Sequence, residues 1–350
     1  MADARQPSEP GRQRPRVAVV VGPGRSGTSA LTGALRALSV DLGNNLKPAL
    51  RKNAKGFFED RDLLNVNHRL HRVLGLRATG TSVGPIEPQR WNDPVLSDLR
   101  QEAVQVIRDR FGSAPLWGFK CGGMIRVLPF WEDVLSELGL DIFYLVAIRN
   151  PLNMASSRAI LDTYRGAQEK SDAEWLSQIV PYFQRILARP FIAVDYDHMV
   201  GDPTHELSRI ARLLRIEVTP ALEQQIRDYA AGFITPGLRH HRATLDELAR
   251  DPNVNTLTRD AYGWLLRLAS DSVDPQSPEF RADWQRIERS FTEMGPLLRH
   301  IDYLEDRLRR RGPTLKSVWG TVLQHLPVAA TLIGGEPSRR PRMRRATQDS

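Results

Sequence analysis

The stretch that decides the fold is Gly22-Pro23-Gly24-Arg25-Ser26-Gly27-Thr28-Ser29, which stands between an apolar run over residues 17–21 and a helical pattern over residues 30–38. A buried strand, a glycine-rich turn and a helix start form a phosphate cradle, because backbone N–H groups and the helix dipole favour an anion there. The spacing from Gly22 to Gly27 is that of a nucleoside-triphosphatase loop, but Thr28 stands where that loop has its lysine. The positive charge comes earlier, at Arg25. We therefore expect this loop to bind a phosphate without the lysine that reaches a γ-phosphate.

The composition is that of an ordinary protein with a full core, in one large domain or two small ones. The formal charge of +8 is concentrated in the tails, because residues 1–16 carry +2 and residues 336–350 carry +3, which leaves about +3 for the body. A nucleic-acid binder would more often place its charge on a folded face. We therefore expect no nucleic-acid partner, and a body that attracts small polyanions.

The single cysteine, Cys121, excludes an internal disulfide and a cysteine-based zinc site. The apolar run at 17–21 is too short for a signal-peptide core, and no stretch reaches the roughly 20 apolar residues of a membrane span. These features predict a cytoplasmic protein.

Short apolar runs alternate with helical patterns along the chain. Strands are predicted over 16–21, 116–120, 141–148 and 191–194. Helices are predicted over 59–74, 95–111, 125–138, 172–187, 203–214 and 278–311, and the chain beyond residue 215 reads as mostly helical. Near-continuous apolar strands separated by helices predict an α/β fold, with a central parallel sheet in a P-loop-like three-layer arrangement followed by a mostly helical C-terminal region.

A second anion site is predicted where the third strand ends, at Arg149-Asn150-Pro151. An arginine at the carboxyl end of a parallel strand faces the ligand crevice of an open sheet. Ser157 comes two turns later on the next helix, so it lies on the same side as the residues that begin that helix. A guanidinium and a hydroxyl suit a phosphate monoester. A structural ion pair of Arg149 is the alternative.

The glycine-rich loop and the Arg-Asn-Pro motif together indicate a family more specifically than either motif does alone. The loop Gly24-Arg25-Ser26-Gly27-Thr28-Ser29, followed by Arg-Asn-Pro with a serine eight residues past the arginine, resembles the 3′-phosphoadenosine 5′-phosphosulfate-dependent sulfotransferases, in particular their bacterial and tyrosyl-protein branches. A third stretch, Val194-Asp195-Tyr196-Asp197-His198-Met199-Val200, is similar to the end of a strand in that family. The resemblance covers roughly residues 16–215.

The resemblance implies which residues hold the nucleotide. It assigns the 5′-phosphosulfate to Arg25, Ser26, Gly27, Thr28 and Ser29, and the 3′-phosphate to Arg149 and Ser157. Cytosolic members carry an adenine-stacking tryptophan where this chain has Ala30, so Tyr196 is the candidate for the adenine contact, with a packing role as the alternative.

The segment Lys55-Gly56-Phe57-Phe58-Glu59 resembles the part of the family that supplies the general base. Sulfuryl transfer to a hydroxyl requires one, because the acceptor's proton must leave as the bond to sulfur forms. Glu59 is the predicted base, and His68 on the following helix is the runner-up. The alternative for Glu59 is a helix-start carboxylate that complements the dipole.

Two further cationic features complete the predicted site. Lys120 ends a strand and would face the cleft, where an ammonium could stabilise the sulfuryl oxygens. Arg25 is the other cation assigned a catalytic role. Cys121 beside Lys120 reads as a packing residue. The loop over residues 235–242, with Arg239, would close over the nucleotide or the acceptor, and no metal is required.

The predicted organisation is a disordered basic tail over 1–15, a sulfotransferase-like domain over 16–275, a helical extension over 276–333 and a basic tail over 334–350. The apolar stretch 316–333 reads as a packing segment or a homodimer contact, with a foot on a membrane surface as the other interpretation.

The leading function is a sulfotransferase acting on a hydroxyl of a glycan, lipid or secondary metabolite. The alternatives are a P-loop kinase or nucleotide-dependent switch, which predicts dependence on magnesium and triphosphate, and a scaffold that keeps a degenerate nucleotide fold.

Overall fold

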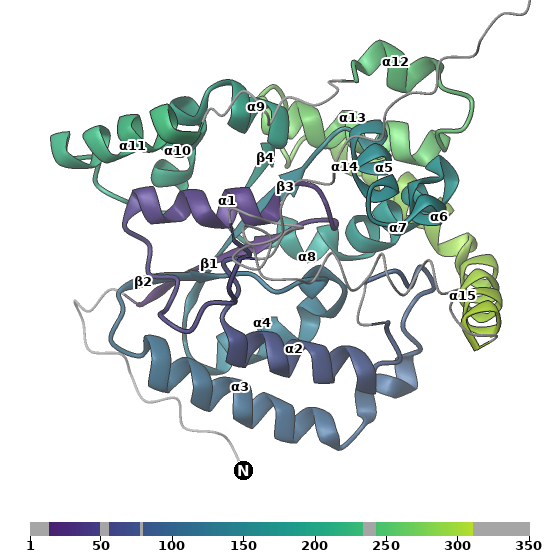
Figure 1. Ribbon diagram of the computed structural model, residues 1–350, viewed down its shortest axis with the longest axis horizontal. Helices are drawn as coiled ribbons and strands as arrows, with labels where there is room; N and C mark the ends of the chain where they lie inside the picture. Colours follow the sequence, from purple (N-terminus) through teal and green to yellow (C-terminus); the bar gives the residue numbers. More distant parts are fainter. Residues whose placement is uncertain (1–13, 50–55, 78–79, 234–242, 311–350) are drawn as a thin grey trace, which may run out of the picture.

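The computed structural model describes residues 14–49, 56–77, 80–233 and 243–310. Its four strands are β1 (Arg16–Val21), β2 (Leu116–Phe119), β3 (Asp141–Ile148) and β4 (Phe191–Asp195). They form one parallel sheet in the order β2-β1-β3-β4 (Figure 1). The predicted parallel sheet is confirmed, and the bounds expected for β1 and β3 are those observed.

The other regular elements of the described chain are helices. The α-helices are α1 (Thr28–Ala34), α2 (Arg61–Val73), α3 (Val95–Phe111), α4 (Leu128–Glu137), α5 (Pro151–Ala159), α6 (Thr163–Gly166), α7 (Gln168–Ile179), α8 (Phe183–Leu187), α9 (Tyr196–Gly201), α10 (Pro203–Leu213), α11 (Pro220–Phe233), α12 (Leu245–Arg250), α13 (Thr256–Ala269), α14 (Pro278–Glu293) and α15 (Gly295–Arg310). Short 3₁₀ turns lie at η1 (Leu35–Leu38), η2 (Pro88–Asn92), η3 (Met124–Val127) and η4 (Val180–Tyr182).

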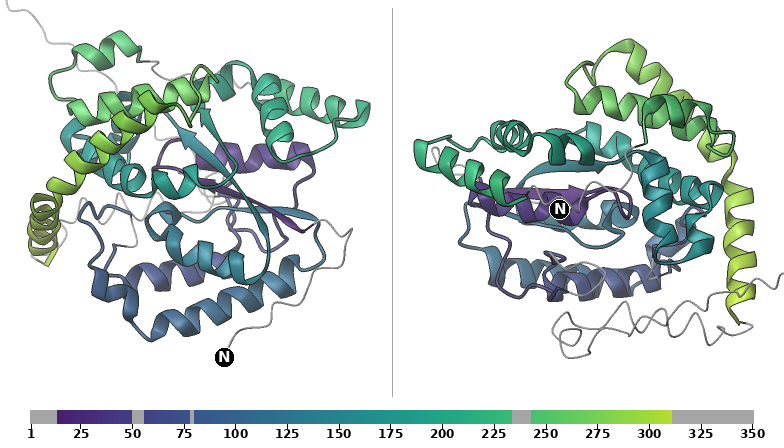
Figure 2. Two further views of the ribbon diagram at one scale, coloured as in Figure 1. Left: turned by 180° about the vertical axis from the view of Figure 1, so that it is seen from behind. Right: turned by 45° about the horizontal axis from the view of Figure 1, so that its top comes forward.

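The sheet is covered on both faces because side chains alternate along each strand. In β1, Val17, Val19 and Val21 enter a core with residues of α2, α3, α4 and α7, whereas Ala18 and Val20 enter a second core with α1, α10 and α11. Figures 1 and 2 show the resulting three layers, with the sheet between α1, α10 and α11 on one side and α2, α3 and α4 on the other.

The C-terminal helices share the larger core with the sheet. Phe280, Trp284 and Ile287 of α14 are fully buried in it, and the ring of Trp284 lies 4.4 Å from that of Phe183, centre to centre. The predicted boundary at 275/276 thus falls just before a helix that packs against the first part of the chain. That division stays a prediction, and the tails over 1–13 and 311–350 lie outside the described residues.

Two predicted helices are interrupted. The helix expected over 172–187 is broken into α7, η4 and α8, and that expected over 278–311 ends at Glu293 and restarts at Gly295. Each break lies at a proline, Pro181 and Pro296. Proline has no N–H to donate, and its ring clashes with the carbonyl four residues earlier. These two helix predictions were wrong because the helical spacing of apolar residues continues across each proline, whereas the helical backbone is interrupted there.

The order of the strands brings the two predicted anion sites to one place. β1 lies between β2 and β3, so the chain leaves β1 toward one edge of the sheet and leaves β3 toward the other. The carboxyl ends of two such strands form the point at which parallel sheets bind ligands. The glycine-rich loop follows β1 and Arg149 follows β3, so both predicted anion sites meet at this point.

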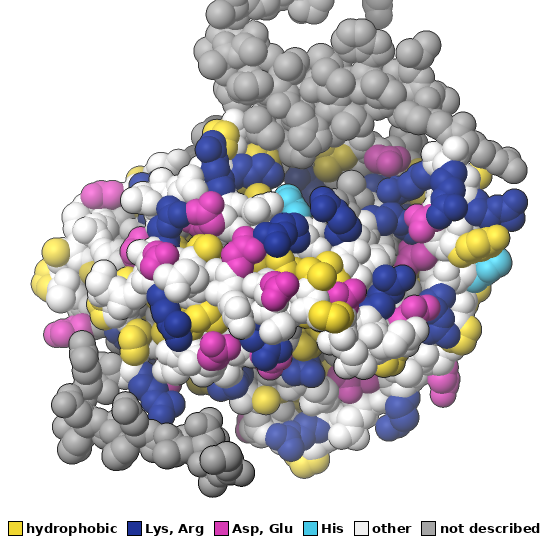
Figure 3. All heavy atoms as spheres, turned by 90° about the horizontal axis from the view of Figure 1, so that it is seen from below, with side chains coloured by type: hydrophobic (Ala, Val, Ile, Leu, Met, Phe, Trp, Pro, Cys, Tyr) yellow, Lys and Arg dark blue, Asp and Glu magenta, His cyan; other side chains and the backbone are white. Residues whose placement is uncertain are grey.

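Charges on the body are mixed on the face that Figure 3 shows, where basic and acidic side chains are interspersed over most of the surface. Within the part of the chain that the structure describes, no helix is long and apolar enough to cross a bilayer.

A buried histidine in α2 makes stability depend on pH. His71 is 1% exposed, and neither ring nitrogen has a hydrogen-bond partner among the described residues. Burial, with a contribution from Arg126, lowers its pKa from 6.5 to about 4. The unfolded chain therefore binds a proton before the folded chain does, and stability is lost as pH falls from 6.5 toward about 4.

We expect the protonation of His71 to lower the free energy of unfolding by about 3 kcal/mol across that pH interval. The measurement is urea unfolding of the parent and of His71→Met near neutral pH and at about pH 4. The variant should lose less stability than the parent on acidification. Asp172 titrates in the same range because burial raises its pKa to about 6, so the difference between the two proteins is the readout. Equal losses would rule out His71 as the source.

Candidate functional site

The loop after β1 is held in a conformation that few residues allow. Gly22 has φ of 151°, and a Cβ there would lie 2.4 Å from the carbonyl oxygen of Ala147 in β3. Gly27, with φ of 96°, lies against the ring of Tyr196, and Arg25 also has a positive φ, of 80°. The two glycines let the loop lie directly on β3 and α9, which places the start of α1 beside the ends of both strands.

The N-terminus of α1 has neither a side-chain cap nor an acidic residue in its first turn. The described residues supply no acceptor for the backbone N–H groups of Gly27, Thr28 and Ser29, whereas those of Gly24 and Ser26 bond to Gln178 and Pro23. Unpaired N–H groups favour an anion. The side chain of Ser26 is unpaired as well: its Oγ is buried and has no hydrogen-bond partner among the described residues.

Two further arginines, Arg149 and Arg165, lie near Arg25 of the loop. The Nε of Arg25 donates to Ser157 Oγ at 3.0 Å, and the guanidinium of Arg149 stacks on Tyr196, with its Cζ 4.4 Å from the ring centre. Burial lowers the pKa of Arg25, although its side chain reaches the surface, and the positive charges of Arg149 and Arg165 lower it further. Among the described residues no carboxylate pairs with Arg25 or Arg149, so these like charges favour an anion. Arg25, Ser157, Arg149 and Tyr196, four of the residues predicted for the nucleotide, thus lie together.

The loop is braced from beneath by α5 and α7. Arg158 is fully buried, donates to the carbonyl oxygen of Gly24 at 3.1 Å and to Ser171 Oγ at 2.6 Å, and lies 3.4 Å from the carboxylate of Glu174. Gln178 Oε1 accepts from Gly24 N at 2.8 Å. Burial lowers the pKa of Arg158 to about 10. This brace was not predicted, and the only sequence signal is an arginine directly after the Ser156–Ser157 pair.

A second cluster joins the loop to the predicted base. The Nζ of Lys120 lies 3.0 Å from Glu59 Oε1 and 3.2 Å from Ser29 Oγ. Glu59 is 4% exposed and Lys120 5%, so the ion pair is almost completely buried. Burial lowers the pKa of Lys120, and the Glu59 carboxylate opposes that shift. The structure thus brings a lysine to the loop from β2, where the sequence has none at Thr28.

Glu59 does not serve as the first residue of α2. Asp60 is the N-cap, and its carboxylate accepts from the N–H groups of Asp62 and Leu63. Asp60, and not Glu59, is therefore the carboxylate at the start of α2 that complements the helix dipole. Gly122 lies beside Glu59, since a Cβ there would be in ordinary van der Waals contact with Oε1, at 3.5 Å.

A second lysine and a histidine lie near Glu59. The Nζ of Lys47 lies 3.8 Å from Glu59 Oε2 and 4.5 Å from the ring centre of Phe57. His68 is half-buried, and burial and the nearby Lys47 lower its pKa, whereas Glu59 raises it. Lys47 was not predicted; the signal that could have found it is that the chain has only six lysines.

The remaining predicted residues divide into two groups. Cys121 is buried, and burial raises the pKa of its thiol, so its packing role is confirmed. Lys55, Arg239 and the rest of the 235–242 loop lie outside the described residues. The described residues contain no group of three or more His, Cys, Asp or Glu that could hold a metal ion.

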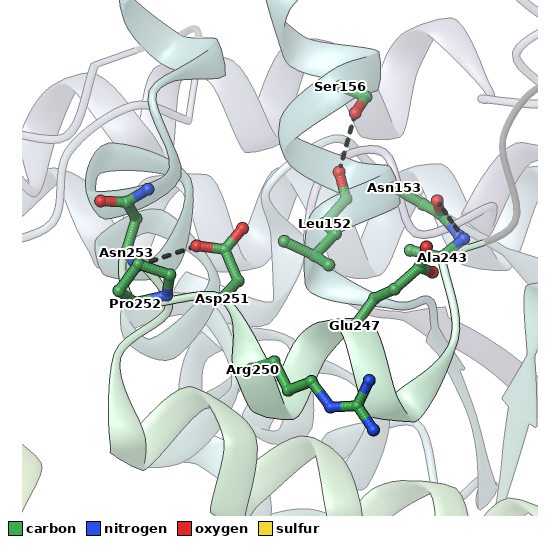
Figure 4. A pocket seen from close by; sticks show the side chains of 9 residues that line it. All are labelled: Leu152, Asn153, Ser156, Ala243, Glu247, Arg250, Asp251, Pro252 and Asn253. Carbon is green, nitrogen blue, oxygen red and sulfur yellow. Dashed lines mark hydrogen bonds between the residues drawn. The ribbon is translucent and has the colours of Figure 1, made fainter.

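A hollow of about 660 Å³ lies between α5 and α12, on the helix that carries Ser157, the partner of Arg25. Figure 4 shows Leu152, Asn153 and Ser156 on one side and Glu247 and Arg250 on the other. Asn153 Oδ1 accepts from the N–H of Ala243 at 3.1 Å, and Asn150 Nδ2 donates to the carbonyl oxygen of Ala243 at 2.9 Å. The segment after Ala243 is thereby tied to the start of α5, one residue from Arg149.

No protein-family model matches the chain, and no curated protein matches it in sequence. Among solved structures, it is similar to the sulfotransferase STF9 of Mycobacterium avium, with 16% identity and a TM-score of 0.41 over 75% of this chain and 78% of that one. It is also similar to the sulfotransferase domain of the Synechococcus PCC 7002 olefin synthase, with 15% identity and a TM-score of 0.35 over 82% of this chain and 98% of that one.

A third solved structure, retinol dehydratase in a complex with retinol and PAP, has 12% identity and a TM-score of 0.31 over 79% of this chain and 82% of that one. The class named by these structures is the one that the loop and Arg-Asn-Pro motifs resemble.

Proposed function

We propose that this chain is a sulfotransferase that moves a sulfuryl group from 3′-phosphoadenosine 5′-phosphosulfate to a hydroxyl of a glycan, lipid or small-molecule acceptor. The observation that carries the proposal is the position of Lys120, whose ammonium contacts both the Glu59 carboxylate and Ser29 of the loop. Glu59, Lys120 and Ser29 form one hydrogen-bonded chain at the carboxyl edge of the sheet, which supports their proposed roles as base, cation and part of an anion-binding loop.

In the proposed reaction each cluster has a separate task. Arg25 and the start of α1 hold the 5′-phosphosulfate, and Arg149 with Ser157 holds the 3′-phosphate, because guanidinium and hydroxyl groups match phosphate oxygens. The acceptor oxygen attacks sulfur in line with the leaving phosphate. Glu59 takes the acceptor's proton, and Lys120 balances the negative charge that develops on the transferred group and the departing phosphate.

The test of the proposal is ligand-dependent thermal stability. Adenosine 3′,5′-bisphosphate at about 100 times its dissociation constant should raise the unfolding free energy by ~2.7 kcal/mol. ATP with magnesium and duplex DNA are the comparison ligands for the kinase and scaffold alternatives. Stabilisation by ATP with magnesium alone would contradict the proposal, and formation of a sulfated product from a panel of hydroxyl acceptors would identify the acceptor class.

Arg149→Ala should weaken binding of adenosine 3′,5′-bisphosphate about 10- to 100-fold, because a charge-assisted hydrogen bond contributes about 1.5–3 kcal/mol. Calorimetric titration of the folded protein measures the change. Arg212→Ala, which removes an exposed arginine of α10, is the matched control and should bind as the parent does. Equal affinity of Arg149→Ala and the parent would remove Arg149 from the site.

A further inference from the structure

One face of α15 is fixed against the body by its acidic residues. Asp302 lies 2.8 Å and Asp306 2.9 Å from the guanidinium of Arg77, which also pairs with Glu305. Lys170 lies 2.5 Å from the other oxygen of Glu305. All three carboxylates of the helix are therefore engaged with the body, together with the buried Leu298. These contacts fix the rotation of α15 about its own axis.

The opposite face, which we call the outer face, is apolar and exposed. Leu297, Leu304 and Leu308 are 58%, 44% and 63% exposed, and Tyr303 is 54% exposed. The spacing of seven and then four residues places the three leucines in one stripe along the helix. The helix itself stands at the edge of the molecule in Figures 1 and 2.

The charges on the outer face have one sign. Arg307 and Arg310 are exposed and form no ion pair with any described residue, and the Cζ of Arg307 lies 5.8 Å from the ring centre of Tyr303. The acidic residues of α15 point the other way. At the right-hand edge of Figure 3, where α15 lies, dark blue and yellow side chains stand next to one another.

Leucines beside unpaired arginines suit an anionic lipid surface. The apolar side chains enter the boundary between headgroups and acyl chains while the guanidinium groups meet the lipid phosphates. A nucleic acid would leave the leucines exposed, and a second copy of this face would bring arginines against arginines. The sequence continues the pattern, since residues 307–335 contain five arginines and lysines and no aspartate or glutamate.

We propose that the outer face of α15 is a docking surface for anionic membranes. The proposal does not depend on the proposed function, because it concerns only where the protein binds. It is tested with the full chain and two kinds of vesicle, phosphatidylcholine alone and phosphatidylcholine mixed in equal parts with phosphatidylglycerol. Flotation should recover the parent with the anionic vesicles only, and increasing salt should release it.

Two variants address the two components of the surface. Leu304→Glu/Leu308→Glu should lower the partition coefficient at least about tenfold, and Arg307→Glu should lower it about fivefold or more. Val218→Glu and Arg36→Glu introduce the same changes at exposed positions far from α15, and they should bind as the parent does. All of these positions are exposed, so equal melting temperatures should show that folding is intact.

Three results would overturn the proposal. The first is a parent that binds neither kind of vesicle, and the second is an outer-face variant that binds as well as the parent does. The third is a change of the double variant from dimer to monomer in light scattering without a change in vesicle binding, which would make the outer face a contact between copies.

Discussion

Replacing Glu59 by glutamine is expected to lower turnover by a factor on the order of 10²–10⁴ and to leave binding of adenosine 3′,5′-bisphosphate nearly unchanged. Glutamine keeps the shape of the side chain and an oxygen that can accept from Lys120. It lacks the carboxylate that takes the acceptor's proton. Single-turnover kinetics at saturating donor measures the chemical step, and titration with the bisphosphate measures binding.

The control for this variant is Glu206→Gln. Glu206 is also a buried carboxylate in an ion pair, 2.8 Å from Arg209 on α10, but it takes no part in the proposed site. It should lose stability and keep its turnover per folded molecule. If Glu59→Gln turned over at the parent's rate, the proton acceptor would have to be another group, and His68→Gln would be the next variant to measure.

Lys120→Met is expected to reduce turnover about 10²- to 10³-fold, the size observed when one preorganised group that stabilises transition-state charge is removed. It should also lower the unfolding free energy by about 3–5 kcal/mol, because it leaves the buried Glu59 carboxylate without its closest partner. Urea unfolding measures the second effect, and kinetics corrected for the folded fraction measures the first.

Lys170→Met separates these two effects. Lys170 is another buried lysine, paired with Glu305 and donating to the carbonyl oxygen of Thr81 at 3.0 Å. We expect a comparable loss of stability and an unchanged rate. A Lys120→Met enzyme with the parent's rate per folded molecule would reduce Lys120 to a partner that only positions Glu59.

Much of the fold could be read from local patterns. Strands β1 and β3 are continuous apolar runs with turn residues at their ends, and α3 begins after Asp93-Pro94 and ends at Gly112, as helix signals require. The broken helices at Pro181 and Pro296 were missed because hydrophobic period and proline chemistry conflict there. The packing of α14 against the sheet could not be read at all, since periodicity identifies an apolar face without identifying what covers it.

The residues of the candidate site also divide into those that a local motif predicts and those whose roles depend on contacts with distant parts of the chain. Residues on the glycine-rich loop and after β3 could be predicted from the sequence because each motif is a short continuous stretch. Lys47, Arg158 and Gln178 were missed because their roles depend on contacts across 12, 134 and 154 positions of the chain, respectively.

The sequence by itself determined which segments become strands, which turn has the glycines and the free helix start that suit an anion, and which side-chain types follow the strands. These are properties of neighbouring residues and follow from backbone sterics and side-chain chemistry. Only the tertiary structure decided that Lys120 lies between Glu59 and Ser29, that Asp60 rather than Glu59 caps α2, and that α15 turns its acids inward and its arginines outward. Those outcomes depend on the order of strands in the sheet and on burial, which bring residues distant in sequence within hydrogen-bonding reach.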